Sequence, residues 1–332
     1  MAVREDYLKA LGPLTPLYAE KMVTEIIVDS PQRILVERNG KLEAAAAVFD
    51  SSAEIQKVID ALVALSGIET RPGQSIFELS FPGGEGRAVA VLPPTSSAGP
   101  ILVIRKLMRT EWITWDKLVE FGSVSAEAIE FLKHAVFAPV NILISGGAGA
   151  GKTTIANRVV ELIPAEERVI VVERDREMQA RHPGVLYLQA GGPGKVAIDG
   201  LILTASKMRP DWLIVGELMG AEAMTAVEVL GRGHSGMVTM HAESVEDSLA
   251  RLEAMCLTAN LGLRLDDIRG LIAAAFGLVL HQKRLPNGKR VIVEIAELRG
   301  LEQGRYVLNR LFRYNLDAAR LEATGMKPGW QD

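Results

Sequence analysis

The sequence lacks the features that would mark a secreted, disulfide-bonded or membrane-spanning protein. Its 332 residues include one cysteine, Cys256, so the chain can form no intramolecular disulfide and offers no cysteine cluster for zinc. It has no run of 18 apolar residues, and the charged residues 1–6 lack the core of a signal peptide. We therefore expect a reduced, cytoplasmic protein without a membrane span of its own.

An excess of basic charge is also absent. The formal net charge is −4, so a generally basic nucleic-acid-binding surface is not indicated, although a local patch stays possible. The composition, 48% hydrophobic and 23% charged, is ordinary for a globular protein, and 332 residues can build two cores. We expect two domains.

The most informative stretch is a glycine-rich loop between a predicted strand and a predicted helix. It matches the pattern G-x-x-x-x-G-K-[ST], follows the apolar run 140–145, and leads into helical periodicity. Its residues are Gly146, Gly147, Ala148, Gly149, Ala150, Gly151, Lys152, Thr153 and Thr154. Such a loop turns backbone N–H groups and a helix N-terminus toward an anion, which predicts phosphate binding. The alternative is a glycine-rich turn that only joins a strand to a helix.

The two residues after the last glycine of this loop have distinct expected roles. Lys152 would reach the β- and γ-phosphates of a nucleotide, and the Thr153 hydroxyl would hold Mg²⁺. The cofactors predicted from this motif are therefore ATP and Mg²⁺.

The hydrophobic pattern divides the chain into an N-terminal α+β sheet domain (1–106), a linker (107–122) and an α/β domain with a mostly parallel sheet (123–332). In the first domain we expect a hairpin at Asn39-Gly40, a turn at Pro82-Gly83-Gly84, and a helix that runs from a capping box at Ser51–Glu54 to Gly67. In the second, four continuously apolar runs predict buried strands, 142–144, 169–172, 212–215 and 237–240. The polar tail after about residue 316 is expected to fray.

Charged residues at strand ends are the next candidates. Arg87 and Arg105 each lie at one end of a predicted strand of the first domain, either as solvated charges or as ligands of a phosphate. Glu173 and Glu217 follow apolar strands of the second domain, at the edge where ligands of an open α/β sheet bind. Glu217 is the better catalytic candidate: it could polarise the attacking water or hold Mg²⁺ through water. An exposed strand-end glutamate is the alternative.

Two histidines, His234 and His241, are placed on either side of a short predicted strand. A zinc site would need further ligands that the sequence does not clearly supply. A sensor of the γ-phosphate, or a structural hydrogen-bonding pair, fits the pattern better, and satisfied polar residues at a turn are the third possibility.

Together these motifs resemble those of the secretion-superfamily ATPases. The glycine-rich loop is similar to the Walker A motif of that family, 172–177 to its Asp box, 208–217 to its Walker B motif, and 233–242 to its His box, in the same order and spacing. Segments of the N-terminal half, such as 99–106, are also similar. The resemblance covers roughly residues 12 to 300 and is greatest to the CpaF/TadA motors of Tad (Flp) pili, followed by the conjugative type IV secretion ATPases.

The resemblance implies a RecA-like P-loop ATPase domain in a homohexameric motor. In that family the nucleotide lies between the N- and C-terminal domains, and arginines at positions that match Arg87 and Arg105 complete the site. It also implies that Glu217 is the catalytic carboxylate, that Glu173 and Glu177 belong to the Asp box, and that His234 and His241 belong to the His box. The implied location is the cytoplasmic face of the inner membrane, on a platform protein of a pilus or secretion system.

Two positions depart from the family pattern. Arg174 follows Glu173 where the family usually has aspartate, and Met219 stands two residues after Glu217 where arginine is common. Both departures could slow turnover. The four-cysteine zinc module of type II secretion and type IV assembly ATPases is missing, which argues against those branches.

Two other classes of function stay open at this stage. A nucleic-acid translocase on the same core fold would need a basic channel, which the acidic balance disfavours. A nucleotide-switched assembly protein would bind ATP with negligible turnover, and Arg174 and Met219 keep that alternative open.

Overall fold

The computed structural model describes residues 2–38, 41–46, 49–81, 85–107, 110, 112–190 and 196–331. It divides into two compact units, Met1–Arg109 and Thr110–Asp332, each with its own sheet. The prediction of an N-terminal sheet domain followed by a larger α/β domain is confirmed.

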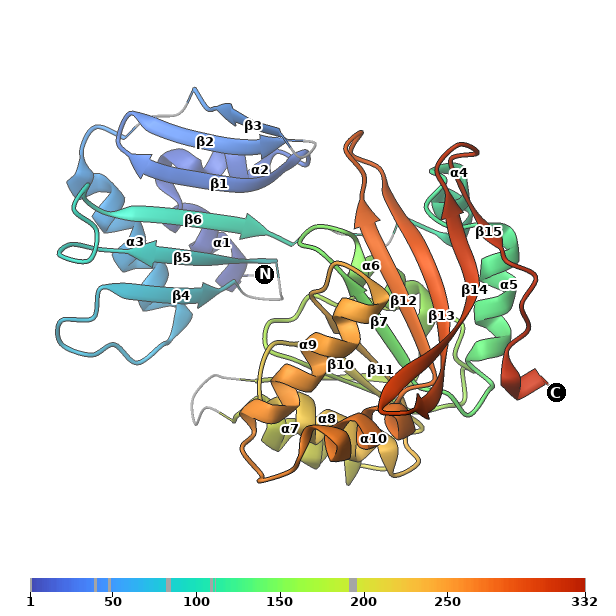
Figure 1. Cartoon of the computed structure of the whole chain (residues 1–332). Helices are drawn as coiled ribbons and strands as arrows, with labels where there is room; N and C mark the ends of the chain where they lie inside the picture. Colours follow the sequence, from blue (N-terminus) through green and yellow to red (C-terminus); the bar gives the residue numbers. More distant parts are fainter. Residues whose placement is uncertain are drawn as a thin grey trace. The chain divides into compact units, whose positions relative to one another are not determined.

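The first unit is a six-stranded antiparallel sheet in the order β3-β2-β1-β6-β5-β4 (Figure 1). Its strands are β1 (Val23–Ser30), β2 (Arg33–Arg38), β3 (Lys41–Ala44), β4 (Ile76–Ser80), β5 (Gly86–Val91) and β6 (Ile101–Lys106). Its helices are α1 (Ala2–Ala10), the 3₁₀ turn η1 (Gly12–Leu14), α2 (Thr15–Ala19) and α3 (Ser52–Ser66). Alternate strand residues such as Ile26 and Ile104 are buried in one core with Ile59 of α3, so that core lies on the helix-covered face of the sheet.

The local predictions for this unit have different outcomes. Helix α3 ends at Gly67 as expected, in the left-handed conformation (φ 66°). The capping box is wrong, because Ser51 makes no side-chain cap and the Glu54 carboxylate instead accepts the backbone N–H of Asp50 at 2.8 Å. The turns at 39–40 and 82–84 lie outside the described residues, but β2 and β3 pair antiparallel as a hairpin requires.

The second unit contains a nine-stranded sheet in the order β15-β14-β13-β12-β7-β11-β10-β8-β9. Its strands are β7 (Ile142–Gly146), β8 (Val169–Glu173), β9 (Val185–Gln189), β10 (Trp212–Leu218), β11 (Ser235–Met240), β12 (Leu278–Arg284), β13 (Arg290–Glu302), β14 (Arg305–Asn315) and β15 (Arg320–Ala323). The pairs from β12 across to β9 run parallel, whereas β13, β14 and β15 extend the sheet in antiparallel fashion. The four strands predicted as buried are β7, β8, β10 and β11.

Helices cover both faces of this sheet, which is why its central strands are apolar throughout (Figure 1). They are α4 (Trp115–Glu120), α5 (Ala126–Ala135), α6 (Lys152–Val160), α7 (Ile198–Ser206), α8 (Glu222–Gly231), α9 (Val245–Thr258), α10 (Leu265–Ala275) and the 3₁₀ turn η3 (Gly329–Gln331). Ile142 and Ile144 join a core with α5 and α6, while Leu143 joins the opposite core with α7 to α10. Strand β7 is thus buried on both faces.

The prediction of a frayed tail is wrong for most of the residues after 316. Strand β15 pairs with β14, and Leu321 is buried in the core. The ring of Trp330 lies 6.0 Å from that of Phe131 on α5. These aromatic and aliphatic contacts hold the segment despite its polar composition. In the part of the chain that the structure describes, no helix is long and apolar enough to cross a membrane.

Candidate functional site

The loop between β7 and α6 has the backbone geometry that phosphate binding requires. Gly149 (φ 66°) and Gly151 (φ 99°) adopt conformations that residues with a Cβ atom rarely adopt. Gly146 lies so close to β12 that a Cβ atom there would be 2.4 Å from the carbonyl oxygen of Gln282. Helix α6 begins directly after Gly151, and the N–H groups of its first turn need a partner from outside the helix. The loop therefore fits a polyphosphate.

The other members of the loop take the positions expected of them. Ala150 is buried and Ala148 is exposed, whereas Thr153 and Thr154 are half-buried in the first turn of α6. Gly147 is half-buried beside Glu243. Thr153, whose hydroxyl is the predicted ligand of Mg²⁺, is thus the second residue of α6, which begins directly after the loop glycines.

Lys152 is buried, and its ammonium group lies under the loop. Its Nζ atom donates to the carbonyl oxygens of Gly146 (3.1 Å) and Gly147 (3.2 Å). It also lies 3.3 Å from Nδ1 of His241 and 3.9 Å from Oε1 of Glu217. The loop lysine therefore lies among residues contributed by three neighbouring strands.

The carboxylate of Glu217 is held by His241. The two residues come from β10 and the end of β11, which are adjacent parallel strands, and the distance between His241 Nε2 and Glu217 Oε1 is 3.0 Å. Because the ammonium of Lys152 can only donate, Nδ1 of His241 accepts, and the nitrogen near Glu217 is the one that carries the proton. The structure thus joins three sequence-predicted residues in one chain of polar contacts. Glu217 lies within β10 rather than beyond its end.

Glu173 ends β8 and is almost fully buried against the neighbouring strand. Its Oε1 atom accepts the backbone N–H groups of Glu177 (3.0 Å) and Met178 (2.8 Å). Burial raises the pKa of Glu173 to about 7, although these two hydrogen bonds oppose the rise. A Cβ atom on Gly216 would lie 2.6 Å from Cγ of Glu173, so glycine is needed beside Glu217. Glu173 therefore supports the strand that carries Glu217.

Two further predicted residues, Glu177 and His234, are not part of the chain formed by Lys152, His241 and Glu217. Glu177 contributes its backbone N–H to Glu173 and is itself half-buried. His234 precedes β11, whereas His241 follows it, so the two histidines are at opposite ends of this strand. At about 3.3 Å per residue the separation is roughly 20 Å. Within this chain the structure places His234 at the end of β11 away from His241, and its part in nucleotide binding stays a prediction.

Arg87 and Arg105 belong to the first unit, where they form one pair. They are directly opposite each other on the antiparallel strands β5 and β6, so both side chains lie on the same face. Glu25 of β1 faces Arg105 from the other side. Arg105 is exposed and Arg87 is half-buried. Their part in nucleotide binding stays a prediction.

A comparison with known protein families identifies one that spans both units. Residues 8–289 match the family described as "Type II/IV secretion system protein". The chain belongs to this family.

Three curated bacterial proteins are similar in sequence to most of this chain. A Mycobacterium tuberculosis (strain CDC 1551 / Oshkosh) protein with a provisional conjugal transfer name is 31% identical over 91% of this chain and 88% of its own length. The conjugal transfer protein TrbB of Rhizobium radiobacter is 29% identical over 86% of each chain. The type IV secretion system protein VirB11 of Bartonella quintana (strain Toulouse) is 28% identical over 87% of this chain and 92% of its own.

Solved structures show the same fold at lower identity. The pilus retraction motor PilT with bound ADP has a TM-score of 0.60 at 18% identity, covering 95% of this chain and 83% of its own. The ATPase DotB of Legionella pneumophila has a TM-score of 0.57 at 19% identity, covering 87% and 80%. This secretion-family chain therefore shares the two-domain fold of PilT and DotB.

Arg290 is a residue at the loop that the sequence did not indicate. It begins β13, and its Nε atom donates to the carbonyl oxygen of Gly149 at 2.7 Å. The hairpin that joins β12 to β13 carries this residue, and nothing in the sequence placed that hairpin beside the loop. The pairing of β12 with β7, strands far apart in the sequence, brings it there.

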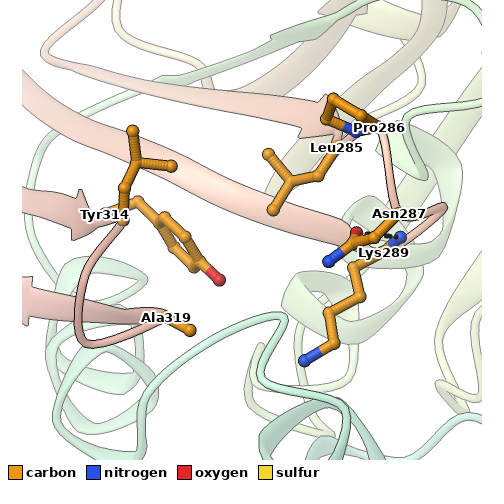
Figure 2. A pocket seen from close by; sticks show the side chains of 7 residues that line it. Leu285, Pro286, Asn287, Lys289, Tyr314 and Ala319 are labelled. Carbon is orange, nitrogen blue, oxygen red and sulfur yellow. Dashed lines mark hydrogen bonds between the residues drawn. The ribbon is translucent and has the colours of Figure 1, made fainter.

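The same hairpin, between β12 and β13, also lines an open pocket (Figure 2). It has a volume of about 290 Å³ and is lined by Leu285, Pro286, Asn287, Lys289, Tyr314, Leu316 and Ala319. None of these residues belongs to the loop or to the chain formed by Lys152, His241 and Glu217, so the pocket is separate from that site. Among the described residues no group of three or more His, Cys, Asp or Glu side chains could hold a metal ion.

Proposed function

We propose that this chain hydrolyses MgATP at the loop of residues 146–154 and powers a type IV secretion or conjugal transfer system. The observation that carries the proposal is the chain of polar contacts from Lys152 through His241 to Glu217 beside the loop. Lysine and the helix N-terminus supply positive charge for the phosphates, and a carboxylate supplies the base.

We propose a task for each residue of this chain. Lys152 binds the β- and γ-phosphates and neutralises charge that develops during transfer. Glu217 orients the attacking water and takes its proton, while His241 keeps that carboxylate in place. Thr153, and Glu217 through water, would hold Mg²⁺, which would supply positive charge to neutralise the phosphates. Gly216 and Glu173 support the strand that bears the base.

Arg87 and Arg105 are proposed to contact the phosphates of the bound nucleotide. Their planar guanidinium groups suit the charge on a transferring phosphoryl group. Their direct opposition on β5 and β6 gives the two cations one location on the first unit. Substituting each arginine by lysine should lower kcat more than it raises KM, because lysine lacks the planar fork.

The relatives favour secretion or conjugation over a pilus motor as the process that is powered. The match extends over 86% of the conjugal transfer protein TrbB and 92% of VirB11. A Tad pilus motor is the second candidate and rests on the similarity of the N-terminal segments, including 99–106. For either machine we propose a homohexamer, bound peripherally to an inner-membrane platform protein at the cytoplasmic face. A nucleic-acid translocase is disfavoured by the net charge of −4.

The deciding experiment measures phosphate release from MgATP over a range of protein concentrations, with Glu217→Gln in parallel and with DNA present or absent. An oligomeric ATPase gives a specific activity that rises with concentration and vanishes in the variant, while the variant still binds ATP. Equal release by both proteins would contradict the role of Glu217. Negligible release with ATP bound would leave a nucleotide switch, and strong stimulation by DNA would favour the translocase.

A further inference from the structure

Glu222, the first residue of α8, binds the turn that follows β10, the strand that carries Glu217. Its side chain is 6% exposed, and its Oε1 atom accepts the backbone N–H groups of Met219 (2.7 Å) and Gly220 (3.1 Å). A buried carboxylate with two backbone donors fixes the path of those donors. Glu222 thus fixes the path that the chain takes after β10 ends at Leu218, two to three residues beyond Glu217.

Arg174 completes the environment of this carboxylate. It is the first residue after β8, and its Nη2 atom lies 2.8 Å from Oε1 of Glu222. Burial alone would raise the pKa of Glu222, but the N–H of Met219 and the guanidinium of Arg174 outweigh burial, so the pKa lies below its ordinary value. Glu222 is thus held as a carboxylate.

Two consecutive residues at the end of β8, Glu173 and Arg174, therefore act on the chain before and after Glu217, the first by direct packing and the second through Glu222. Glu173 packs against Gly216, the residue before Glu217. Arg174 reaches Glu222, which binds the amides of Met219 and Gly220 after Glu217. Since a base displaced by even 1 Å loses much of its effect, contacts that hold Gly216 on one side of Glu217 and the Met219–Gly220 turn on the other bear on the rate.

We propose that Arg174 is a positioning residue for Glu217, acting through the Glu222 carboxylate and the Met219–Gly220 turn. The inference rests on the proposed ATP hydrolysis, because it assigns Arg174 to that same site. It also gives a physical account of the two departures from the family pattern. Met219 leaves no cation on the turn, its side chain is 61% exposed, and Arg174 supplies the cation from the neighbouring strand instead.

The test compares Arg174→Gln, which removes the charge, with Arg174→Lys, which keeps it. Arg320→Gln is the matched control, because Arg320 forms an exposed ion pair with Glu322 on β15, away from the loop. For each protein we would measure kcat and KM for MgATP, the melting temperature, and hydrogen exchange of a peptide that covers residues 212–224.

We expect Arg174→Gln to lower kcat about fivefold to tenfold while KM changes less than about twofold. Hydrogen exchange at the amides of Met219 and Gly220 should become faster in Arg174→Gln. Arg174→Lys should recover about half of the lost kcat. Arg320→Gln should resemble the unaltered protein in both measurements. A kcat within twofold of that of the unaltered protein, or unchanged exchange at the two amides, would overturn the proposal. The proposal would also be overturned if Arg174→Lys lowered kcat as much as Arg174→Gln does.

The two proposals fail in different ways. If the unaltered protein releases no phosphate, ATP hydrolysis is refuted, and Arg174 is then judged by hydrogen exchange alone. Unchanged exchange in Arg174→Gln refutes the positioning contact whether or not the protein is active.

Discussion

The Nε2 atom of His241 lies 3.0 Å from Oε1 of Glu217, while the other nitrogen of the same ring lies 3.3 Å from Nζ of Lys152. One imidazole therefore contacts both the loop lysine and the carboxylate of Glu217. Lys152 Nζ and Glu217 Oε1 form a long ion pair at 3.9 Å, and without the ring the two groups could approach more closely and withdraw the carboxylate from water.

The first prediction concerns this ring. His241→Ala should lower kcat about tenfold to a hundredfold, because the carboxylate loses its donor. His241→Gln, whose amide can both accept and donate, should retain more activity than the alanine variant. Steady-state phosphate release measures both. His134→Ala, an exposed substitution on α5, is the control, and a His241→Ala rate equal to that of this control would contradict the prediction.

The second prediction concerns the pH dependence of stability. The pKa of Glu173 is raised by burial from 4.5 to about 7, so between these values the folded protein binds a proton that the unfolded chain does not. Its contribution to stability is present below about pH 4.5 and is lost as the pH rises through about 7. Glu173→Gln should therefore melt about 5 °C above the unaltered protein at pH 8 and near it at pH 5.

Thermal unfolding at pH 5, 6, 7 and 8 measures this difference. Glu127→Gln, an exposed substitution on α5, should show the pH dependence of the unaltered protein. If Glu173→Gln has the same pH profile as the unaltered protein, the carboxyl group of Glu173 does not titrate in this range.

The third prediction concerns the hairpin beside the loop. Arg290→Ala removes the donor to the Gly149 carbonyl, so the loop is less ordered before nucleotide binds. KM for MgATP should rise about threefold to tenfold, while the melting temperature changes by less than about 2 °C because Arg290 is exposed. Lys289→Ala, one residue earlier, should leave KM unchanged. Equal effects of the two substitutions would count against a specific contact with Gly149.

Much of the second unit follows from local sequence rules. The strand, loop and helix around Lys152 were predictable because the residue pattern restricts the backbone directly. The four buried strands were predictable because both of their faces are covered, which requires continuous apolar runs. Glu217 and His241 were recognisable because they lie at the ends of such strands.

Contacts between distant segments were not predictable in this way. Arg174 and Arg290 contact the site because β8 adjoins β10 and β12 adjoins β7, and neither adjacency is written in a local pattern. His234 was grouped with His241 because they are close in sequence, although an extended strand separates their side chains. The tail was predicted to fray because its polar residues conceal the packing of Leu321 and Trp330.

The strand that ends in the glycine-rich loop is the middle strand of the nine, with β12 on one side and β11 on the other. Its backbone hydrogen bonds are therefore protected by neighbouring ladders on both sides and by a core on each face. Such a strand opens only when the unit as a whole unfolds. The loop is thus anchored to a strand that resists local opening, so its origin stays fixed even where the exposed turns around it move.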